Sequence, residues 1–142
     1  MPMFNRTATA KWNGTGKEGK GWVSTETKSL DSAYNFAFRF GDEKGTNPEE
    51  LIAAAHASCF NMKLAFTLDA AGMTAEELNT TAHLTLDKAP GDWTITKIHL
   101  VTTAKIPGAD NAKFQECVAT AKAGCPVSRV LNAEITAEAS LV

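Results

Sequence analysis

The sequence predicts an α+β fold, in which strands and helices occupy separate stretches of the chain. Residues 47–71 carry the end signals and the length of one long helix, and the stretches on either side of it are rich in Thr, Val and aromatic residues, as strands are. No repeat, low-complexity tract or Pro/Ser-rich linker divides the chain, so we expect residues 1–142 to form a single domain.

The N-terminal third predicts three strands. They are expected at residues 7–12, 21–30 and 34–40. In the third strand, aromatic residues alternate with smaller or polar ones in a period of two: Tyr34, Phe36, Phe38 and Phe40. This alternation is typical of a strand with one buried face. We therefore expect the aromatic side chains to face a core and Arg39 to face away from it.

A long helix is predicted from Pro48 to about Ala71. Asn47 is a suitable N-cap, Pro48 suits the first helical position, and Glu50 follows the cap by three residues, as in a capping box. Gly72 should end the helix. Its apolar residues go nearly all the way round, so we expect it inside a core or a subunit interface.

The remaining chain predicts a hairpin, two helices and a last strand. The hairpin strands are expected at 80–88 and 93–105, joined by a turn that contains Pro90-Gly91-Asp92. Helical periodicity covers 111–123, Gly124 interrupts it, and Pro126 opens a short helix that should reach about Asn132. A strand at 134–141 completes the order βββ-α-ββ-αα-β.

Charge and cysteine content limit the classes of function. The formal charge of −2, with both signs interspersed, argues against nucleic-acid binding and against a membrane surface, and favours a small molecule or protein partner. The apolar stretch 51–68 is interrupted by polar residues, and the N-terminus has no signal-peptide pattern, so a soluble, cytoplasmic protein is expected. Three cysteines without CxxC spacing suit a reducing compartment, where a disulfide would be transient and functional.

Two cysteines occupy settings that suggest chemistry. Cys125 precedes Pro126 at the start of a short helix, where unpaired N–H groups would favour its thiolate, although a buried small residue is an alternative interpretation. Cys59 lies in the middle of the long helix and would need a neighbouring charge. His56, three residues earlier, lies on the same face and is one candidate, or it is simply a packed core residue. Cys117 carries no motif, and we interpret it as packing.

Charged residues near these cysteines complete the candidate site. Arg39, among phenylalanines, must reach solvent or find a carboxylate, and Glu49 could provide one. Such a pair could hold a guanidinium for a thiolate or a peroxide oxygen, or it could be purely structural. Glu50 is an accessory candidate, although helix capping alone would explain it.

Helix geometry adds an expectation about assembly. Glu49 and Cys59 are ten residues apart, which corresponds to about 15 Å along one straight helix. If both act on one substrate, Glu49 comes from a second copy of the chain. We therefore expect a homodimer with composite sites.

Two motifs resemble those of the osmotically inducible protein C (OsmC) family, the sister branch of the organic hydroperoxide resistance proteins (Ohr). They lie at 45–60 and 122–128, and the resemblance extends over nearly the whole chain. It implies an intertwined homodimer with antiparallel sheets around a long central helix. It also implies a thiol peroxidase without metal or haem cofactor, and two sites at the subunit interface.

The resemblance further implies roles for individual residues. Cys59 would be the thiol that reacts with peroxide and Cys125 the thiol that resolves the product, an order opposite to their local helix settings. Arg39 with Glu49 would activate Cys59 and orient the peroxide.

The expected reaction is reduction of an organic hydroperoxide, and more weakly of hydrogen peroxide, through a Cys59–Cys125 disulfide that a dithiol donor restores. The family implies a lipoyl-type donor, and apolar neighbours such as Phe60 should favour organic substrates. Three alternatives remain: a thiol-disulfide exchange protein, a metal-binding module using His56 with both cysteines, and a non-catalytic dimer that binds a lipophilic ligand or a stress partner.

Overall fold

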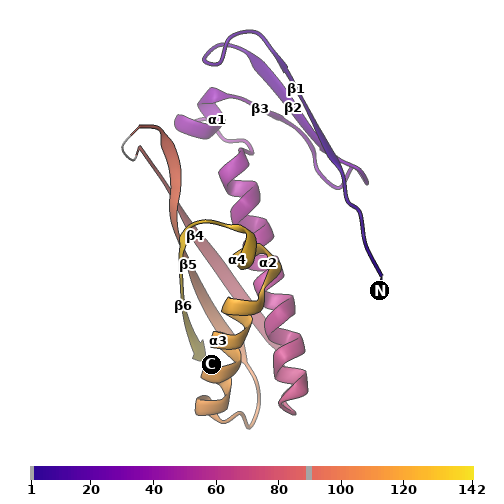
Figure 1. Cartoon of the computed structure of the whole chain (residues 1–142), viewed down its shortest axis with the longest axis vertical. Helices are drawn as coiled ribbons and strands as arrows, with labels where there is room; N and C mark the ends of the chain where they lie inside the picture. The colour runs from indigo at the N-terminus through magenta and orange to yellow at the C-terminus, as the bar shows by residue number, and fades with distance from the viewer. Residues whose placement is uncertain (1, 89–90) are drawn as a thin grey trace. The chain divides into compact units, whose positions relative to one another are not determined.

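The computed structural model describes residues 2–88 and 91–142, which form two compact units, Met1–Leu51 and Ile52–Val142 (Figure 1). Pro90 of the predicted turn lies outside the described residues. The elements are, in chain order, β1 (Ala8–Asn13), β2 (Lys20–Thr25), β3 (Asp31–Tyr34), α1 (Phe36–Phe40), α2 (Pro48–Ala70), β4 (Glu77–Lys88), β5 (Trp93–Lys105), α3 (Asn111–Gly124), α4 (Pro126–Val130) and β6 (Glu134–Leu141).

The first unit contains an antiparallel sheet with the strand order β1-β2-β3. Gly21 lies at its centre and is the cross-strand partner of both Trp12 and Tyr34. Their rings pack at 5.4 Å across it, and a Cβ at Gly21 would collide with both. Glycine is therefore required here by the close approach of two aromatic rings.

The predicted strand at 34–40 is wrong beyond Tyr34, because Phe36–Phe40 form helix α1. Asn35 caps this helix: its side chain accepts a hydrogen bond of 2.8 Å from the backbone N–H of Phe38. Phe36 and Phe40, four residues apart, bring their rings within 5.1 Å on one helix face. The expected core-facing aromatic row is also wrong, since α1 buries none of its residues.

The second unit contains a mixed sheet with the order β4-β5-β6. The predicted hairpin is confirmed, because β4 and β5 pair antiparallel over their whole length. Strand β6 instead runs parallel to β5, so the expectation of antiparallel sheets is corrected at this strand. The chain between them forms α3 and α4, which supply the long crossover that a parallel neighbour needs.

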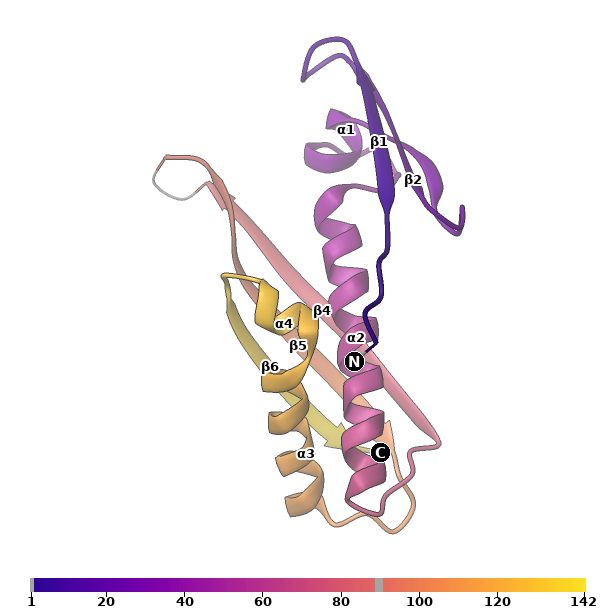
Figure 2. The same ribbon diagram turned by 45° about the vertical axis from the view of Figure 1, so that its right-hand side comes forward.

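Helices α2 and α3 cover one face of this sheet, as Figures 1 and 2 both show. Both helices and β5 contribute fully buried side chains to a single cluster, among them Phe60, Leu64, Leu68, Ile98, Leu100, Phe114 and Ala121. This core fixes the middle of α2, which carries Cys59, and the end of α3, which leads into Cys125.

Helix α2 begins one residue after the predicted cap Asn47, whose side-chain oxygen accepts the N–H of Glu50 at 2.8 Å. By length and composition alone it could cross a membrane, with a mean hydropathy of 1.3 over an 18-residue window. Core helices of soluble proteins have the same property, and Phe60, Leu64 and Leu68 on α2 are fully buried against the sheet.

Candidate functional site

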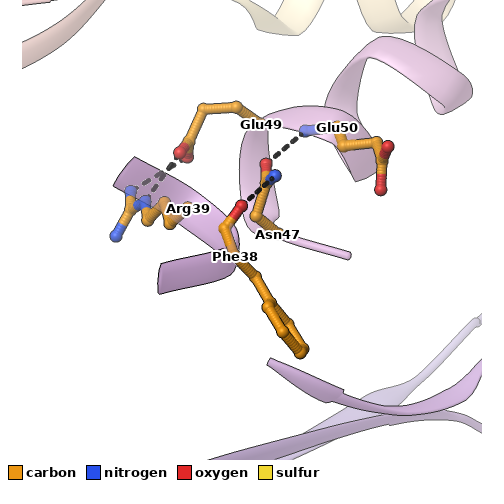
Figure 3. Close-up of polar contacts among 5 residues, drawn as sticks. All are labelled: Phe38, Arg39, Asn47, Glu49 and Glu50. Atoms are coloured by element: carbon orange, nitrogen blue, oxygen red, sulfur yellow. Dashed lines mark hydrogen bonds and ion pairs between the residues drawn. The ribbon is translucent and has the colours of Figure 1, made fainter. Parts of the chain in front are cut away.

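In the first unit, Arg39 and Glu49 form the ion pair that the sequence suggested. Two parallel hydrogen bonds join them: Nε donates to Oε1 at 2.6 Å and Nη2 donates to Oε2 at 2.9 Å (Figure 3). The Glu49 carboxylate holds the pKa of Arg39 above its ordinary value. This two-pronged geometry fixes the orientation of the guanidinium as well as its charge.

The backbone around this ion pair is held by Asn47. Its amide nitrogen donates to the carbonyl of Phe38 at 3.1 Å, while its oxygen caps α2 (Figure 3). Asn47 thereby ties the end of α1, which carries Arg39, to the start of α2, which carries Glu49. The carboxylate of Glu50 points away from the pair in Figure 3.

In the second unit, the structure brings Cys59 and Cys125 together. Their sulfurs lie 2.9 Å apart, although 66 positions separate the residues in the chain. Both thiols are free. Only a short movement would be needed for a disulfide, whose two sulfurs lie about 2 Å apart.

The pKa values of the two thiols shift in opposite directions. Burial opposes ionisation of Cys125, but its hydrogen bond with the Cys59 thiol, the hydrogen bonds from Ser128 and the one from the N–H of Val127 lower its pKa below the ordinary value. Burial raises the pKa of Cys59, and the hydrogen bond to Cys125 raises it further. The directions of these pKa shifts favour Cys125 over Cys59 as the thiolate of the pair. This agrees with the helix-start setting that the sequence showed for Cys125.

The pKa shifts favour Cys125 as the thiolate, but solvent access favours Cys59 as the sulfur that meets a substrate. Cys125 is 0 % exposed, whereas Cys59 is half-buried and lines a surface groove of about 420 Å³. Apolar side chains form much of the groove: Ala55, Met62, Phe66 and Pro126. Phe60, the expected apolar neighbour of the substrate, is instead fully buried in the core.

His56 contacts Ser128, not Cys59. Its Nε2 lies 2.7 Å from the Ser128 hydroxyl, and its imidazole is 0 % exposed. Burial lowers the pKa of His56, so the ring is neutral near neutral pH. This burial agrees with the alternative interpretation of His56 as a packed core residue, and a neutral ring bonded to Ser128 supplies no charge to Cys59.

Lys63 and Ser128 were not predicted from the sequence. Lys63 lies four residues after Cys59 on α2, lines the same groove, and its positive charge favours the Cys59 thiolate. Gly124 leaves the space for it, since a Cβ there would come within 3.0 Å of the Lys63 side chain. Ser128 follows Cys125 by three residues, the spacing at which a helix N-cap receives hydrogen bonds, and this spacing was a signal for it.

The other cysteine predictions have different outcomes. Cys117 is buried in the core cluster, as the packing interpretation required. For the metal-binding alternative, the described part of the chain holds no group of three or more His, Cys, Asp or Glu side chains placed to bind a metal ion.

Comparison with known proteins decides the family. Residues 41–140, which include both cysteines, match the family described as OsmC-like protein. The chain belongs to this family. It is 51 % identical to peroxiredoxin OsmC of Escherichia coli K12 over 93 % of each chain. It is also 30 % identical to the organic hydroperoxide resistance protein OhrA of Bacillus subtilis, over 95 % of this chain and 93 % of the relative.

Solved structures of the OsmC/Ohr family share the fold. An OsmC-like protein from Vibrio cholerae superposes with a TM-score of 0.81 at 17 % identity, covering 97 % of this chain and 100 % of the other. The organic hydroperoxide resistance protein OhrB of Bacillus subtilis gives 0.70 at 26 % identity, covering 94 % and 98 %. The α+β fold with a long helix and two small sheets is thus the fold of the OsmC family.

Proposed function

We propose that this OsmC-family protein is a thiol peroxidase that reduces organic hydroperoxides to alcohols and is restored by a dithiol donor. The observation that carries the proposal is the pair of sulfurs 2.9 Å apart, of which Cys59 lines a groove and Cys125 is buried. The names of the curated relatives, peroxiredoxin and organic hydroperoxide resistance protein, support the same activity.

Access makes Cys59 the attacking sulfur. Its proton first moves to Cys125, which the 2.9 Å separation allows. The Cys59 thiolate then attacks the distal peroxide oxygen, the O–O bond breaks, and the departing alkoxide takes the Cys125 proton to give the alcohol. Cys59 is left as a sulfenic acid and Cys125 as a thiolate.

The second step forms the disulfide. The Cys125 thiolate attacks the Cys59 sulfur, and hydroxide leaves and takes a proton to give water. One hydroperoxide has then been reduced by two thiols, which carry both electrons, so the reaction needs no metal or haem. A dithiol, for which the family resemblance suggests a lipoyl-type group, reduces the disulfide.

Arg39 and Glu49 are proposed to serve the first step. The pair holds a charged, oriented guanidinium, which can stabilise a thiolate or the departing oxygen of the peroxide. For this role, we propose that the Arg39–Glu49 pair of one subunit lies at the Cys59 groove of the partner subunit and forms a composite site with it.

The homodimer is supported by apolar exposure on α2. Met62 is 65 % exposed and Phe66 is 67 % exposed, and both line the groove at Cys59 and a larger neighbouring one of about 680 Å³. Large apolar side chains gathered on one surface are typical of an interface. We propose that a second copy covers them, and that the protein works in the cytoplasm as an antioxidant under stress.

Steady-state turnover tests the proposed function. With cumene hydroperoxide and a dithiol donor, the wild type should consume peroxide, Cys59→Ser should fall to the background rate, and Cys117→Ser should keep its activity. The apolar groove predicts faster reaction with cumene hydroperoxide than with hydrogen peroxide. Turnover by Cys59→Ser would favour a passive ligand-binding dimer, and protein thiol exchange without peroxide reduction would favour the exchange class.

A further inference from the structure

The buried hydrogen-bond chain from His56 through Ser128 to Cys125 is not explained by the peroxidase step alone. Nε2 of His56 lies 2.7 Å from Oγ of Ser128. A side-chain hydrogen bond from Ser128 in turn lowers the pKa of Cys125. His56 and Cys125 are both 0 % exposed. The chain joins α2 to α4 behind the sulfur that solvent does not reach.

The unpartnered ring nitrogen of His56 indicates which group donates in each of these hydrogen bonds. Among the described residues, Nδ1 of His56 is the buried side-chain nitrogen or oxygen that lacks a hydrogen-bond partner. An unpaired acceptor is better tolerated in a core than an unpaired N–H, so we assign the proton to Nε2. Nε2–H then donates to Ser128, which has one hydroxyl hydrogen left to donate to Cys125.

We propose that His56 and Ser128 are positioning residues that direct this chain of hydrogen bonds onto Cys125, so that Cys125 is the sulfur which leaves as thiolate when a dithiol reduces the Cys59–Cys125 disulfide. The inference deepens the proposed function and rests on it for the disulfide. It assigns which sulfur the reductant attacks, and it gives a role to the buried histidine.

The regeneration step follows from this assignment. A thiolate of the dithiol attacks the Cys59 sulfur, which borders the groove, the S–S bond breaks, and Cys125 leaves with the electron pair. The second thiol of the donor, as a thiolate, attacks the donor sulfur bound to Cys59 and releases the Cys59 thiolate. The donor ends as a disulfide, and its two protons end on the protein thiols. A leaving thiol stabilised as thiolate departs faster.

A purely structural role for His56 makes a different prediction. A buried imidazole with an unpaired nitrogen is a poor packing group, so an apolar ring of similar size should serve a packing role as well or better. In that case His56→Phe and Ser128→Ala would change stability and leave the chemistry of Cys125 unaltered. The two explanations therefore differ at the Cys125 sulfur itself.

The first test is a titration that needs no peroxidase activity. Thiolate absorbance is followed against pH in a Cys59→Ala, Cys117→Ala background, where Cys125 is the remaining cysteine. We expect Ser128→Ala and His56→Phe to shift its midpoint upward, by about one pH unit for Ser128→Ala. Ser128→Thr should retain the lower midpoint, because it keeps a hydroxyl donor. Ser140→Ala, on an exposed position of β6, is the matched control.

The second test locates the mixed disulfide. The disulfide is formed in otherwise wild-type protein with diamide, so that no peroxide is needed, and a limiting monothiol is added before alkylation and peptide mapping. The monothiol should be found on Cys59, and Ser128→Ala should slow its attachment about threefold or more. Attachment to Cys125, or an unchanged midpoint in both Ser128→Ala and His56→Phe, overturns the proposal. Failure of peroxide turnover alone would affect the proposed function and leave both readouts intact.

Discussion

The sulfurs of Cys59 and Cys125 lie 2.9 Å apart, yet one borders a groove and the other is fully buried. The fold produces this arrangement by placing the middle of α2 beside the junction of α3 and α4. Each sulfur thus has one property that the reaction needs: Cys59 has access to substrate, and Cys125 has the hydrogen bonds that favour a thiolate.

Replacing the buried Cys125 should separate attack on the peroxide from formation of the disulfide. In Cys125→Ser, Cys59 can still attack a hydroperoxide, but no neighbouring thiol can condense with its sulfenic acid. We expect the mass of one oxygen to appear on Cys59, followed by further oxidation with excess peroxide. Intact-mass spectra after one and after many equivalents of cumene hydroperoxide measure this. If the Cys125→Ser protein stays unmodified, Cys59 is not the sulfur that attacks the peroxide.

The Arg39–Glu49 ion pair should matter more for rate than for stability. Arg39→Lys keeps the charge but cannot form both hydrogen bonds at once. Because the pair is partly exposed, we expect the free energy of unfolding to change by about 1 kcal/mol or less. The second-order rate constant with cumene hydroperoxide should fall by roughly tenfold or more.

Urea unfolding and stopped-flow oxidation separate these two effects for the ion pair. Glu49→Gln should act in the same direction as Arg39→Lys, since it removes the charge that orients the guanidinium. Lys105→Arg, in a surface ion pair with Glu76, is the control. A loss of stability with an unchanged rate would reduce the Arg39–Glu49 pair to a structural role.

His56 should make the fold sensitive to mild acid. Burial lowers its pKa from the ordinary 6.5, so below that pH the unfolded chain binds a proton that the folded chain resists. The free energy of unfolding should therefore be highest above pH 6.5, where His56 is neutral in both states. It should decrease as the pH falls from 6.5 toward the lower pKa of His56 in the folded protein. Urea midpoints at several pH values should show a weaker decrease for His56→Gln than for the wild type. If His99→Gln, at a half-exposed histidine, flattens the curve equally, the burial explanation fails.

The exposed apolar side chains of α2 should hold the homodimer together. Phe66→Glu places a charge on a surface that we expect a second copy to cover, so sedimentation should show monomers where the wild type shows dimers. Val130→Glu, at a position 77 % exposed on α4, should leave the dimer intact. If Phe66→Glu still forms dimers at low micromolar concentration, the interface lies elsewhere on the protein.

Most of the fold could be predicted from local patterns. The cap Asn47, Pro48 and the terminal Gly72 gave the bounds of α2 to within a residue, because capping groups act over one helical turn. Helix α1 was missed because Phe36, Phe38 and Phe40 fit a period of two, while the cap at Asn35 and the ring pair at a spacing of four decided the structure. The parallel pairing of β6 depends on a crossover, which no local pattern shows.

The candidate site was predictable in its residues and less so in its contacts. Arg39 with Glu49 and Cys59 with Cys125 were paired in advance from charge, helix position and family resemblance. The bond from His56 to Ser128 spans 72 positions, so it depends on how α2 and α4 pack and has no sequence signature. The burial of Phe60 was likewise misjudged, because an all-round apolar helix does not reveal which face meets the sheet.

The most direct measurement maps the thiols after one equivalent of cumene hydroperoxide is added to fully reduced wild-type protein. Free thiols are blocked at once, and peptides containing each cysteine are identified by mass. The account predicts a Cys59–Cys125 disulfide, with Cys117 still free. A protein in which Cys59 remains a free thiol while peroxide is consumed, or in which Cys125 is oxidised when Cys59 is replaced by serine, would contradict it.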